Sequence, residues 1–269
     1  MKRTMRVARV LLLVSVVAAI GACNAASDSP REPKAAKNIS GEELLSVSQA
    51  ELSASVSLRQ RVIQFAKTRI RQISRANQTR TDNRARVTAQ LHPYIELLVR
   101  VAPERSQAET LQLLLGPWYS LWTNQEFSGG PNLARIFQVV REGHYYNLSD
   151  SPGPGGIAVI NALRGAYAPM PDALAIRFTS NAMLRGSLVG KTGAEVAALA
   201  DSIEFGATAV IPVPGPIGIT GQLGVLYIDE DLRIANGRQT PVFDDNGNVT
   251  VPGEIGLLYV LERLEGPLR

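Results

Sequence analysis

Gly116–Thr123, with the sequence GPWYSLWT, is the stretch where the pattern of the chain changes from helical to extended. It directly follows a predicted short helix over residues 107–115, which begins at the capping box Ser106-Gln107-Ala108-Glu109. Trp118, Ser120 and Trp122 then alternate with Tyr119, Leu121 and Thr123, and a period of two is typical of a β-strand. The stretch therefore predicts that a helix leads straight into the first strand of a sheet.

Beyond Trp118 the sequence consists of short apolar runs separated by glycine and proline. Many short strands at fairly even spacing favour a β-barrel or a sandwich. A capping box at Thr192–Glu195 predicts one short helix between strands, over residues 194–202, and Asn246-Gly247 is a hairpin signal. The predicted strands are residues 118–123, 134–140, 144–148, 157–163, 173–179, 183–189, 222–228, 232–235 and 256–264.

Residues 41–105, in front of these strands, carry helical periodicity. The capping box Ser40-Gly41-Glu42-Glu43 predicts a helix start, and apolar residues then recur on one face up to Ile73. A second helix is expected over residues 84–101, in which Pro93 either interrupts the helix or starts its last turns. The fold class expected is mainly β with N-terminal helices (α+β): an amphipathic helical segment over 41–105 and a β-barrel over 106–269.

The first 22 residues have the pattern of an export signal. A basic region precedes an apolar stretch of eleven residues, 10–20, which is too short to span a bilayer. The following Ile20-Gly21-Ala22-Cys23 resembles the bacterial lipobox, which implies cleavage before Cys23 and acylation of its thiol. Residues 23–40 then form a polar tether, and Asn24 favours an outer over an inner membrane. The alternative is an ordinary secretory signal with an incidental cysteine.

The charge of the chain is distributed unevenly. Residues 24–86 hold twelve basic and six acidic residues, whereas residues 87–269 hold twelve basic and eighteen acidic ones. Nine of the basic residues lie between Arg59 and Arg86. This basic helical face has two interpretations, attraction to an anionic membrane or pairing with the acidic barrel. Nucleic acid is not an expected partner of an exported chain.

Signatures of catalysis and of metal binding are absent from the sequence. There is no G-x-S-x-G elbow, no phosphate-binding loop and no H-E-x-x-H motif, and one cysteine with two histidines excludes a cysteine-based zinc site. We therefore expect no enzyme, no cofactor and no metal. An enzymatic alternative would need a polar cleft around Glu142, His144 or Asp229.

Two motifs resemble the PAP/fibrillin family of plastid lipid-associated proteins. Gly116, Trp118 and Thr123 match a G-x-W-x-L-x-Y-T strand, with Trp122 in the tyrosine position. A C-terminal pattern of the type Y-L-D-x-x-L-R-I-x-R-G…F-V-L is matched at Tyr227, Asp229, Leu232, Arg233, Ile234, Gly237, Val260 and Leu261, and Tyr259 stands in the usual Phe position. The similarity covers residues 87–264. Asn236 departs from the family, as does the insertion of about eighteen residues before the last strand.

The resemblance implies a lipocalin-like barrel that carries a lipid, prenylquinone or carotenoid, here on a membrane-anchored bacterial lipoprotein. The lumen candidates are Trp118, Trp122, Phe137, Tyr145, Tyr227 and Tyr259, and in the last strand Leu258 and Val260 or their neighbours. Gly116, Asp229, Arg233 and Gly237 are motif residues of structural or charged character. The G-x-W motif is also similar to that of lipocalins, in which the tryptophan closes one barrel end under a basic side chain, here Arg233 or Arg263. The alternative function is that of a structural or interaction lipoprotein with a packed barrel.

Overall fold

The computed structural model describes residues 40–78, 82–125, 136–171, 173–244, 246–251 and 253–266. The chain divides into two units, residues 1–38 and residues 39–269. The predicted signal peptide, Cys23 and all but the last residue of the predicted tether lie outside the described residues. All contacts below belong to the second unit.

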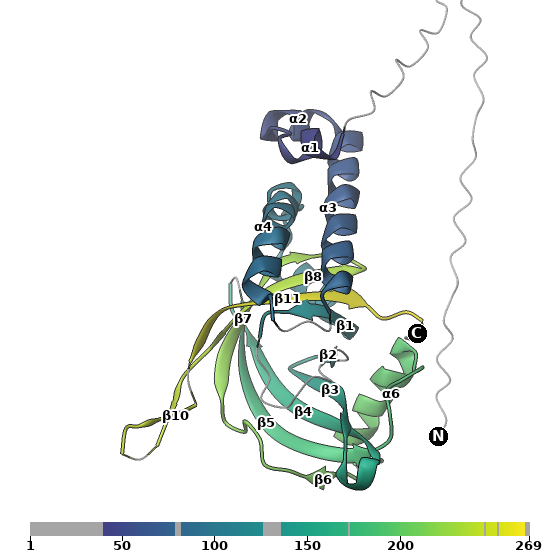
Figure 1. Cartoon of the computed structure of the whole chain (residues 1–269), viewed down its shortest axis with the longest axis vertical. Helices are drawn as coiled ribbons and strands as arrows, with labels where there is room; N and C mark the ends of the chain where they lie inside the picture. Colours follow the sequence, from purple (N-terminus) through teal and green to yellow (C-terminus); the bar gives the residue numbers. More distant parts are fainter. Residues whose placement is uncertain are drawn as a thin grey trace, which may run out of the picture. The chain divides into compact units, whose positions relative to one another are not determined.

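Eight antiparallel strands close into a barrel in which almost every strand pairs with its neighbours along the chain (Figure 1). Pairing of β1 with β11 and of β4 with β5 closes the sheet, so eight strands have no free edge. The strands of the barrel are β1 Gly116–Thr123, β2 Ile136–Arg141, β3 His144–Pro152, β4 Ala158–Pro169, β5 Ala173–Arg185, β7 Thr220–Ile228, β8 Leu232–Gln239 and β11 Glu254–Arg263. The short β6, Ile211–Pro212, pairs with the end of β5.

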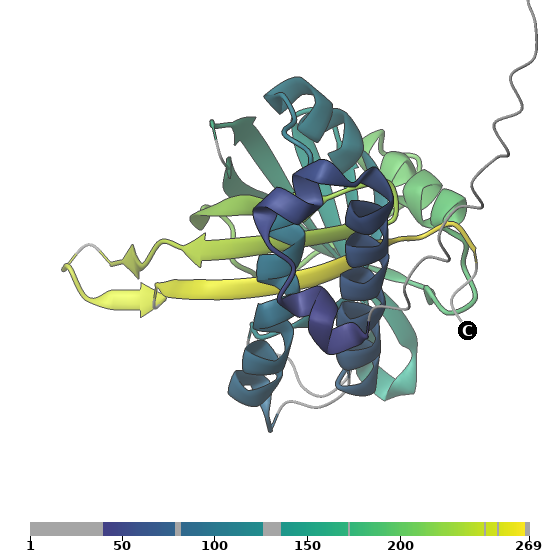
Figure 2. The same cartoon turned by 90° about the horizontal axis from the view of Figure 1, so that it is seen from above.

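The expected β-rich fold with helices in front of it is confirmed at this level. Each predicted strand overlaps an observed one, although residues 134 and 135 lie outside the described residues. Residues 173–179 and 183–185 belong to one strand, β5, and residues 186–189, predicted as strand, are not in one. An irregularity in the pairing of β5 with β4, at Arg164 and Gly165, lets the strand continue where the apolar pattern breaks. The predicted Asn-Gly hairpin lies between β9, Val242–Phe243, and β10, Val249–Val251, which project from the barrel (Figure 2).

The N-terminal helices differ from the prediction in two places. The helix expected to begin at Gly41 is three helices, α1 Gly41–Leu45, α2 Gln49–Ala54 and α3 Val56–Ala76. Ser48 and Ser55 cause the breaks, because each side chain caps the next helix start. Helix α4, Arg84–Val101, continues through Pro93, which is exposed, so that the carbonyl left without a donor can reach water.

Helices cover part of the outer face of the barrel. Helices α3 and α4 lie side by side across the part formed by β1, β7, β8 and β11 (Figures 1 and 2). Helix α6, Gly193–Glu204, covers β1 and β2, and Glu204 accepts hydrogen bonds from Tyr146 and Arg164. Within the described part of the chain, no helix has both the length and the apolar character needed to cross a bilayer.

Candidate functional site

One end of the barrel is closed by Trp118 and helix α5, Gln107–Leu114. The indole of Trp118 is fully buried and donates its Nε1–H to the carbonyl of Leu114 at 2.8 Å. The guanidinium of Arg263 lies 3.9 Å from the centre of the ring, which is a cation–π contact. Arg263 also donates to the carbonyls of Leu113, at 2.6 Å, and Leu115. Of the two candidates, Arg263 is therefore the basic partner of Trp118, and it ties the last strand to the end of α5.

Gly116 is required by this closure. Its φ of +107° is rarely adopted by L side chains, and a Cβ there would lie 2.8 Å from Nη1 of Arg263. Gly143, in the β2–β3 turn, also has a positive φ, of +75°, but a Cβ there would meet no atom within 4 Å.

We expect Gly116→Ala to lower the free energy of unfolding by about 2–3 kcal/mol, and Gly143→Ala by only about 1 kcal/mol, because the first adds a displaced Arg263 to the backbone strain. Urea unfolding of both variants measures the difference. Equal losses would show that the contact with Arg263 adds nothing.

The register of the strands identifies the side chains that face the lumen. Residues directly opposite each other in neighbouring strands share one face of the sheet. Starting from Trp118, this face continues through Gln138, Tyr145, Gly165 and Phe178 around the barrel. The same rule places Tyr167, Leu174, Ile176, Leu223, Val225, Arg233, Ala235, Tyr259 and Leu261 in the lumen.

The lumen face is apolar near Trp118 but also carries polar side chains on β3, β4 and β5, among them Asn147, Asn161 and Asn181, and it is not uniformly buried. Tyr167, Ile176, Phe178, Val225 and Tyr259 pack against the buried residues near Trp118 but are themselves only partly buried, although they point inward. In a barrel filled by its own side chains, such residues would be shielded completely. The interior beyond the plug formed by Trp118 is therefore accessible to solvent.

The six lumen candidates divide equally between the two faces of the sheet. Trp118, Tyr145 and Tyr259 face the lumen, whereas Trp122, Phe137 and Tyr227 lie on the outer face. These three are buried in the larger apolar cluster, which includes the helices, so burial alone does not distinguish the two faces. In the last strand Tyr259 and Leu261, the neighbours of Leu258 and Val260, face inward.

Trp122 lies on the outer face, and not on the predicted inner face, because of a bulge in β1. The register of β1 against β11 shifts between Ser120 and Trp122, so Ser120 lies opposite Leu261 but Trp122 lies opposite Val260. One extra residue exchanges the two faces of a strand. The simple alternation of GPWYSLWT predicts the inner face for Trp122, and the sequence contains no signal for this bulge.

Arg233 is a buried cation inside the barrel. Its side chain is 1% exposed, and Nη1 donates to Oε1 of Gln138 at 2.5 Å. Its Nε–H has no hydrogen-bond partner, and within the described ranges no carboxylate forms an ion pair with it. Asp229, four residues before Arg233, is not its counter-charge, because Asp229 pairs with Lys67 of α3 on the outside of the barrel whereas Arg233 faces the lumen. Burial lowers the pKa of Arg233 to about 10, and the side chain stays charged at neutral pH.

Tyr145 lies beside Arg233, and its ring is held by packing against Gly165 and Phe178. Its ring covers Gly165 so closely that a Cβ there would lie 2.4 Å from the ring, and it meets Phe178 edge-on. Among the described residues no hydrogen bond to its hydroxyl is found. Burial raises the pKa of Tyr145, against the opposing effect of the Arg233 charge, so the phenol stays neutral and gives Arg233 no counter-charge.

Asp229 has a different role, because it joins the barrel to helix α3. Its carboxylate accepts a hydrogen bond from Lys67 at 2.7 Å, from the Tyr227 hydroxyl at 2.5 Å and from the Leu232 amide at 2.9 Å. Lys67 is itself buried and also pairs with Asp231. Asp229 thus lies at the β7–β8 turn and on the outside of the barrel.

Other members of the basic helical face also contact the barrel. Arg71 pairs with Asp231 at 3.0 Å, and Arg75 pairs with Glu262 at 2.7 Å. Pairing with the acidic barrel, one of the two interpretations of residues 59–86, is therefore observed for these side chains. Attraction of the remaining basic residues to a membrane stays a prediction.

Gly237 leaves room for the side chains of Tyr259 and Leu257 in the lumen. A Cβ at this position would lie 2.9 Å from the ring of Tyr259 and 3.1 Å from Cβ of Leu257. The hydroxyl of Tyr259 donates to Oε1 of Gln125 at 2.8 Å. The motif glycine therefore leaves room for the ring of Tyr259, and its role is structural.

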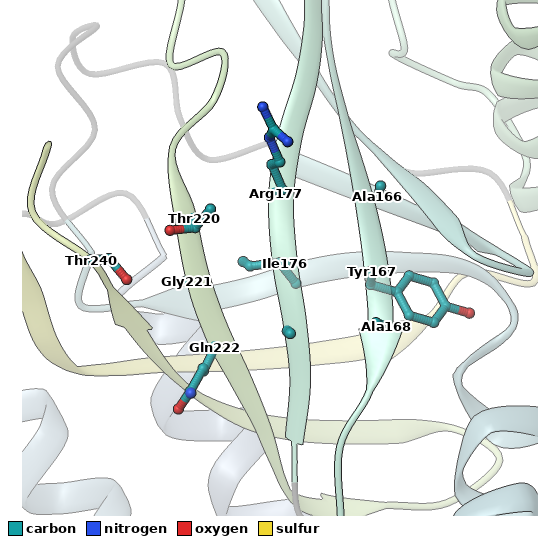
Figure 3. A pocket seen from close by; sticks show the side chains of 10 residues that line it. Ala166, Tyr167, Ala168, Ile176, Arg177, Thr220, Gly221, Gln222 and Thr240 are labelled. Carbon is teal, nitrogen blue, oxygen red and sulfur yellow. The ribbon is translucent and has the colours of Figure 1, made fainter.

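A shallow groove lies on the side of the barrel that the helices leave uncovered (Figure 3). Its volume is about 470 Å³, and Ala166, Ala168, Ala175 and Arg177 are among its outer-face lining residues. The Tyr167 ring points away from Thr220 and Gln222, which lie on the other side of the group (Figure 3). Small side chains on neighbouring strands account for the hollow, whose lining also includes Tyr167 and Ile176 from the lumen face of the sheet.

Two residues of the enzymatic alternative, Glu142 and His144, lie together at the β2–β3 turn, and Asp229 has other partners. His144 contacts the Glu142 carbonyl at 3.1 Å and lies 3.8 Å from Glu204, near α6, whereas Asp229 is held by Lys67. No group of three or more metal-ligating side chains occurs in the parts of the chain that the structure covers.

The fold and this site define an eight-stranded barrel with one plugged end. Comparison with models of known protein families finds no match for this chain, and comparison with curated proteins also finds none.

Proposed function

We propose that this protein binds a small hydrophobic molecule in the lumen of a lipocalin-like barrel. The observation that supports this most directly is the partial exposure of inward-facing apolar side chains such as Phe178 and Val225. Ligand sites in β-barrels are lined by apolar and aromatic residues with a few polar groups, and they open at one end. The plug formed by Trp118 and Arg263 would serve as the floor of such a site.

The resemblance to PAP/fibrillin proteins supports the same proposal. Gly116 and Trp118 form the closed end. Asp229 accepts the Leu232 amide in the β7–β8 turn, and Gly237 leaves room for Tyr259, which gives both motif residues a structural role. By this proposal the ligand is of the lipid, prenylquinone or carotenoid class, and the protein has no enzymatic activity.

Two substitutions test whether the lumen is the binding site. Leu163 faces the lumen opposite Asn147 and is partly buried, whereas Ala168 is exposed in the outer groove. We expect Leu163→Trp to reduce the occupancy of methyl palmitate by more than about tenfold, because an indole there occupies the space for the ligand, and we expect Ala168→Trp to leave it unchanged.

Occupancy is counted by native mass spectrometry of the full chain. Loss of binding in Ala168→Trp but not in Leu163→Trp would move the site to the outer groove. Absence of binding in the unsubstituted protein as well would favour the alternative, a packed structural lipoprotein.

The proposal includes a lipid anchor at Cys23, and it rests on the sequence pattern of residues 1–23. Two or more acyl chains hold a protein firmly, since each buried CH₂ contributes about 0.8 kcal/mol. We expect Cys23→Ser to abolish the mass increment of the lipid and to release the protein from the membrane fraction. An unchanged intact mass would show that Cys23 is not acylated.

A further inference from the structure

We infer that the lumen binds a single-chain amphiphile head first, with a carboxylate held by Arg233. This inference rests on the proposed function and names the chemistry of its ligand. It starts from one observation that neither the fold nor the proposed carrier role requires, which is the buried Arg233 cation, for which no ion pair is found among the described residues.

Burying Arg233 without a counter-charge costs folding free energy. Removing a cation from water costs several kcal/mol unless a counter-charge or a full set of hydrogen bonds replaces the water. Arg233 has Gln138 as its hydrogen-bond acceptor, its Nε–H has none, and Arg263 is a second positive charge nearby. If the charge of Arg233 had no function, an apolar side chain at this position would make the folded protein more stable.

The groups around Arg233 determine what kind of ligand it can hold. A guanidinium presents its donors in a planar fork that matches a carboxylate. The Tyr145 hydroxyl faces the same lumen, lacks a hydrogen bond to any described residue and stays protonated. The amide of Gln138 is already engaged, because its Nε2 donates to Asn147 at 3.1 Å. Arg233 and Tyr145 therefore offer the donors and one uncompensated positive charge, which suits a compact anion.

The position of Arg233 along the barrel determines which way the ligand points. Arg233 lies opposite Leu261 and Ile228, near the start of β8, which is the end closed by Trp118. The apolar side chains Phe178, Val225 and Tyr259 continue from there along the lumen. A carboxylate at Arg233 therefore places an alkyl chain along the apolar wall, towards the end without the plug.

The test is a competition between palmitic acid and methyl palmitate, offered together in equal amounts to the full chain in a non-ionic detergent. Native mass spectrometry resolves the two complexes. We expect the acid complex to exceed the ester complex by roughly tenfold to a hundredfold, the range for a hydrogen bond to a charged group. Arg233→Met should bring the ratio near one, and Arg233→Lys should restore much of it.

Arg177→Gln is the matched control, because Arg177 is exposed on the outer face of the barrel in the groove of Figure 3. It should keep the ratio of the unsubstituted protein. The melting temperature of Arg233→Met is the second readout, and it should be equal to or above that of the unsubstituted protein, because a buried cation has been removed.

The outcomes separate the two proposals. Equal binding of acid and ester by the unsubstituted protein would overturn the role of Arg233 and leave the carrier function standing. A preference that disappears in Arg177→Gln and persists in Arg233→Met would place the anion site in the groove and overturn the inference. Binding of neither compound would overturn both proposals.

Discussion

Trp118→Ala is expected to lower the free energy of unfolding by about 3–5 kcal/mol, the range for truncating a fully buried tryptophan. The indole carries the hydrogen bond to Leu114 and the stacked guanidinium of Arg263. Its removal leaves a cavity at the point where α5, β1 and β11 meet, and the Arg263 charge then loses the ring beneath it. Urea unfolding followed by far-UV circular dichroism measures this loss.

Trp118→Phe is the matched variant for this experiment. It keeps most of the ring contact but loses the Nε1–H donor, so the expected loss is about 1–2 kcal/mol. A loss below about 1.5 kcal/mol for Trp118→Ala would mean that the closed end relaxes without the indole and that Trp118 is no plug.

The second large effect is expected at Asp229. Asp229→Ala should cost about 3–5 kcal/mol, because Lys67 then loses its buried partner while it remains enclosed. The hydroxyl of Tyr227 and the amide of Leu232 lose their acceptor in the same step. Differential scanning calorimetry should show a single transition at a clearly lower temperature.

Asp231→Ala is the control for Asp229→Ala. Asp231 also pairs with Lys67, but half of its side chain is exposed, so the expected loss is below about 1 kcal/mol. Replacing both members of the buried pair, as in Lys67→Met with Asp229→Leu, should recover part of the loss. Equal losses at Asp229 and Asp231 would contradict the description of Asp229 as the centre of this contact.

The same pair predicts how stability depends on pH. Burial alone would raise the pKa of Asp229, but hydrogen bonds from Asp231, Lys67, Tyr227 and Leu232 outweigh burial and hold the pKa well below its ordinary value. A depressed pKa in the folded state contributes stability above the unfolded value, about 3.9, that is lost as the pH falls further. Asp229→Asn should therefore show a weaker loss of stability below about pH 4 than the unsubstituted protein.

Local signals in the sequence predict much of the fold. The capping boxes at Ser40, Ser106 and Thr192 all form, since both partners lie within four residues of each other. The strands follow from short apolar runs between turn residues. The break at Ser48 could also have been predicted, because Ser48 and Glu51 are themselves a capping box, whereas Ser55 has no glutamate three residues on.

The lumen could be predicted only in part, because it depends on contacts between residues far apart in the chain. Arg263 is a better partner for Trp118 than Arg233 because of the register between β1 and β11. The bulge that turns Trp122 outward leaves no mark in the sequence. The partner of Asp229 is Lys67, 162 residues away, and periodicity says nothing about such a pair.

The central claim, that the barrel carries a hydrophobic molecule, is tested most directly by mass spectrometry of what the protein already holds. The full chain is purified from membranes, and its native mass is compared before and after unfolding and extraction with organic solvent. We predict a stoichiometric amphiphile or apolar lipid that is lost on unfolding. A mass equal to that of the acylated chain alone, unchanged after incubation with a membrane lipid extract, would contradict the claim.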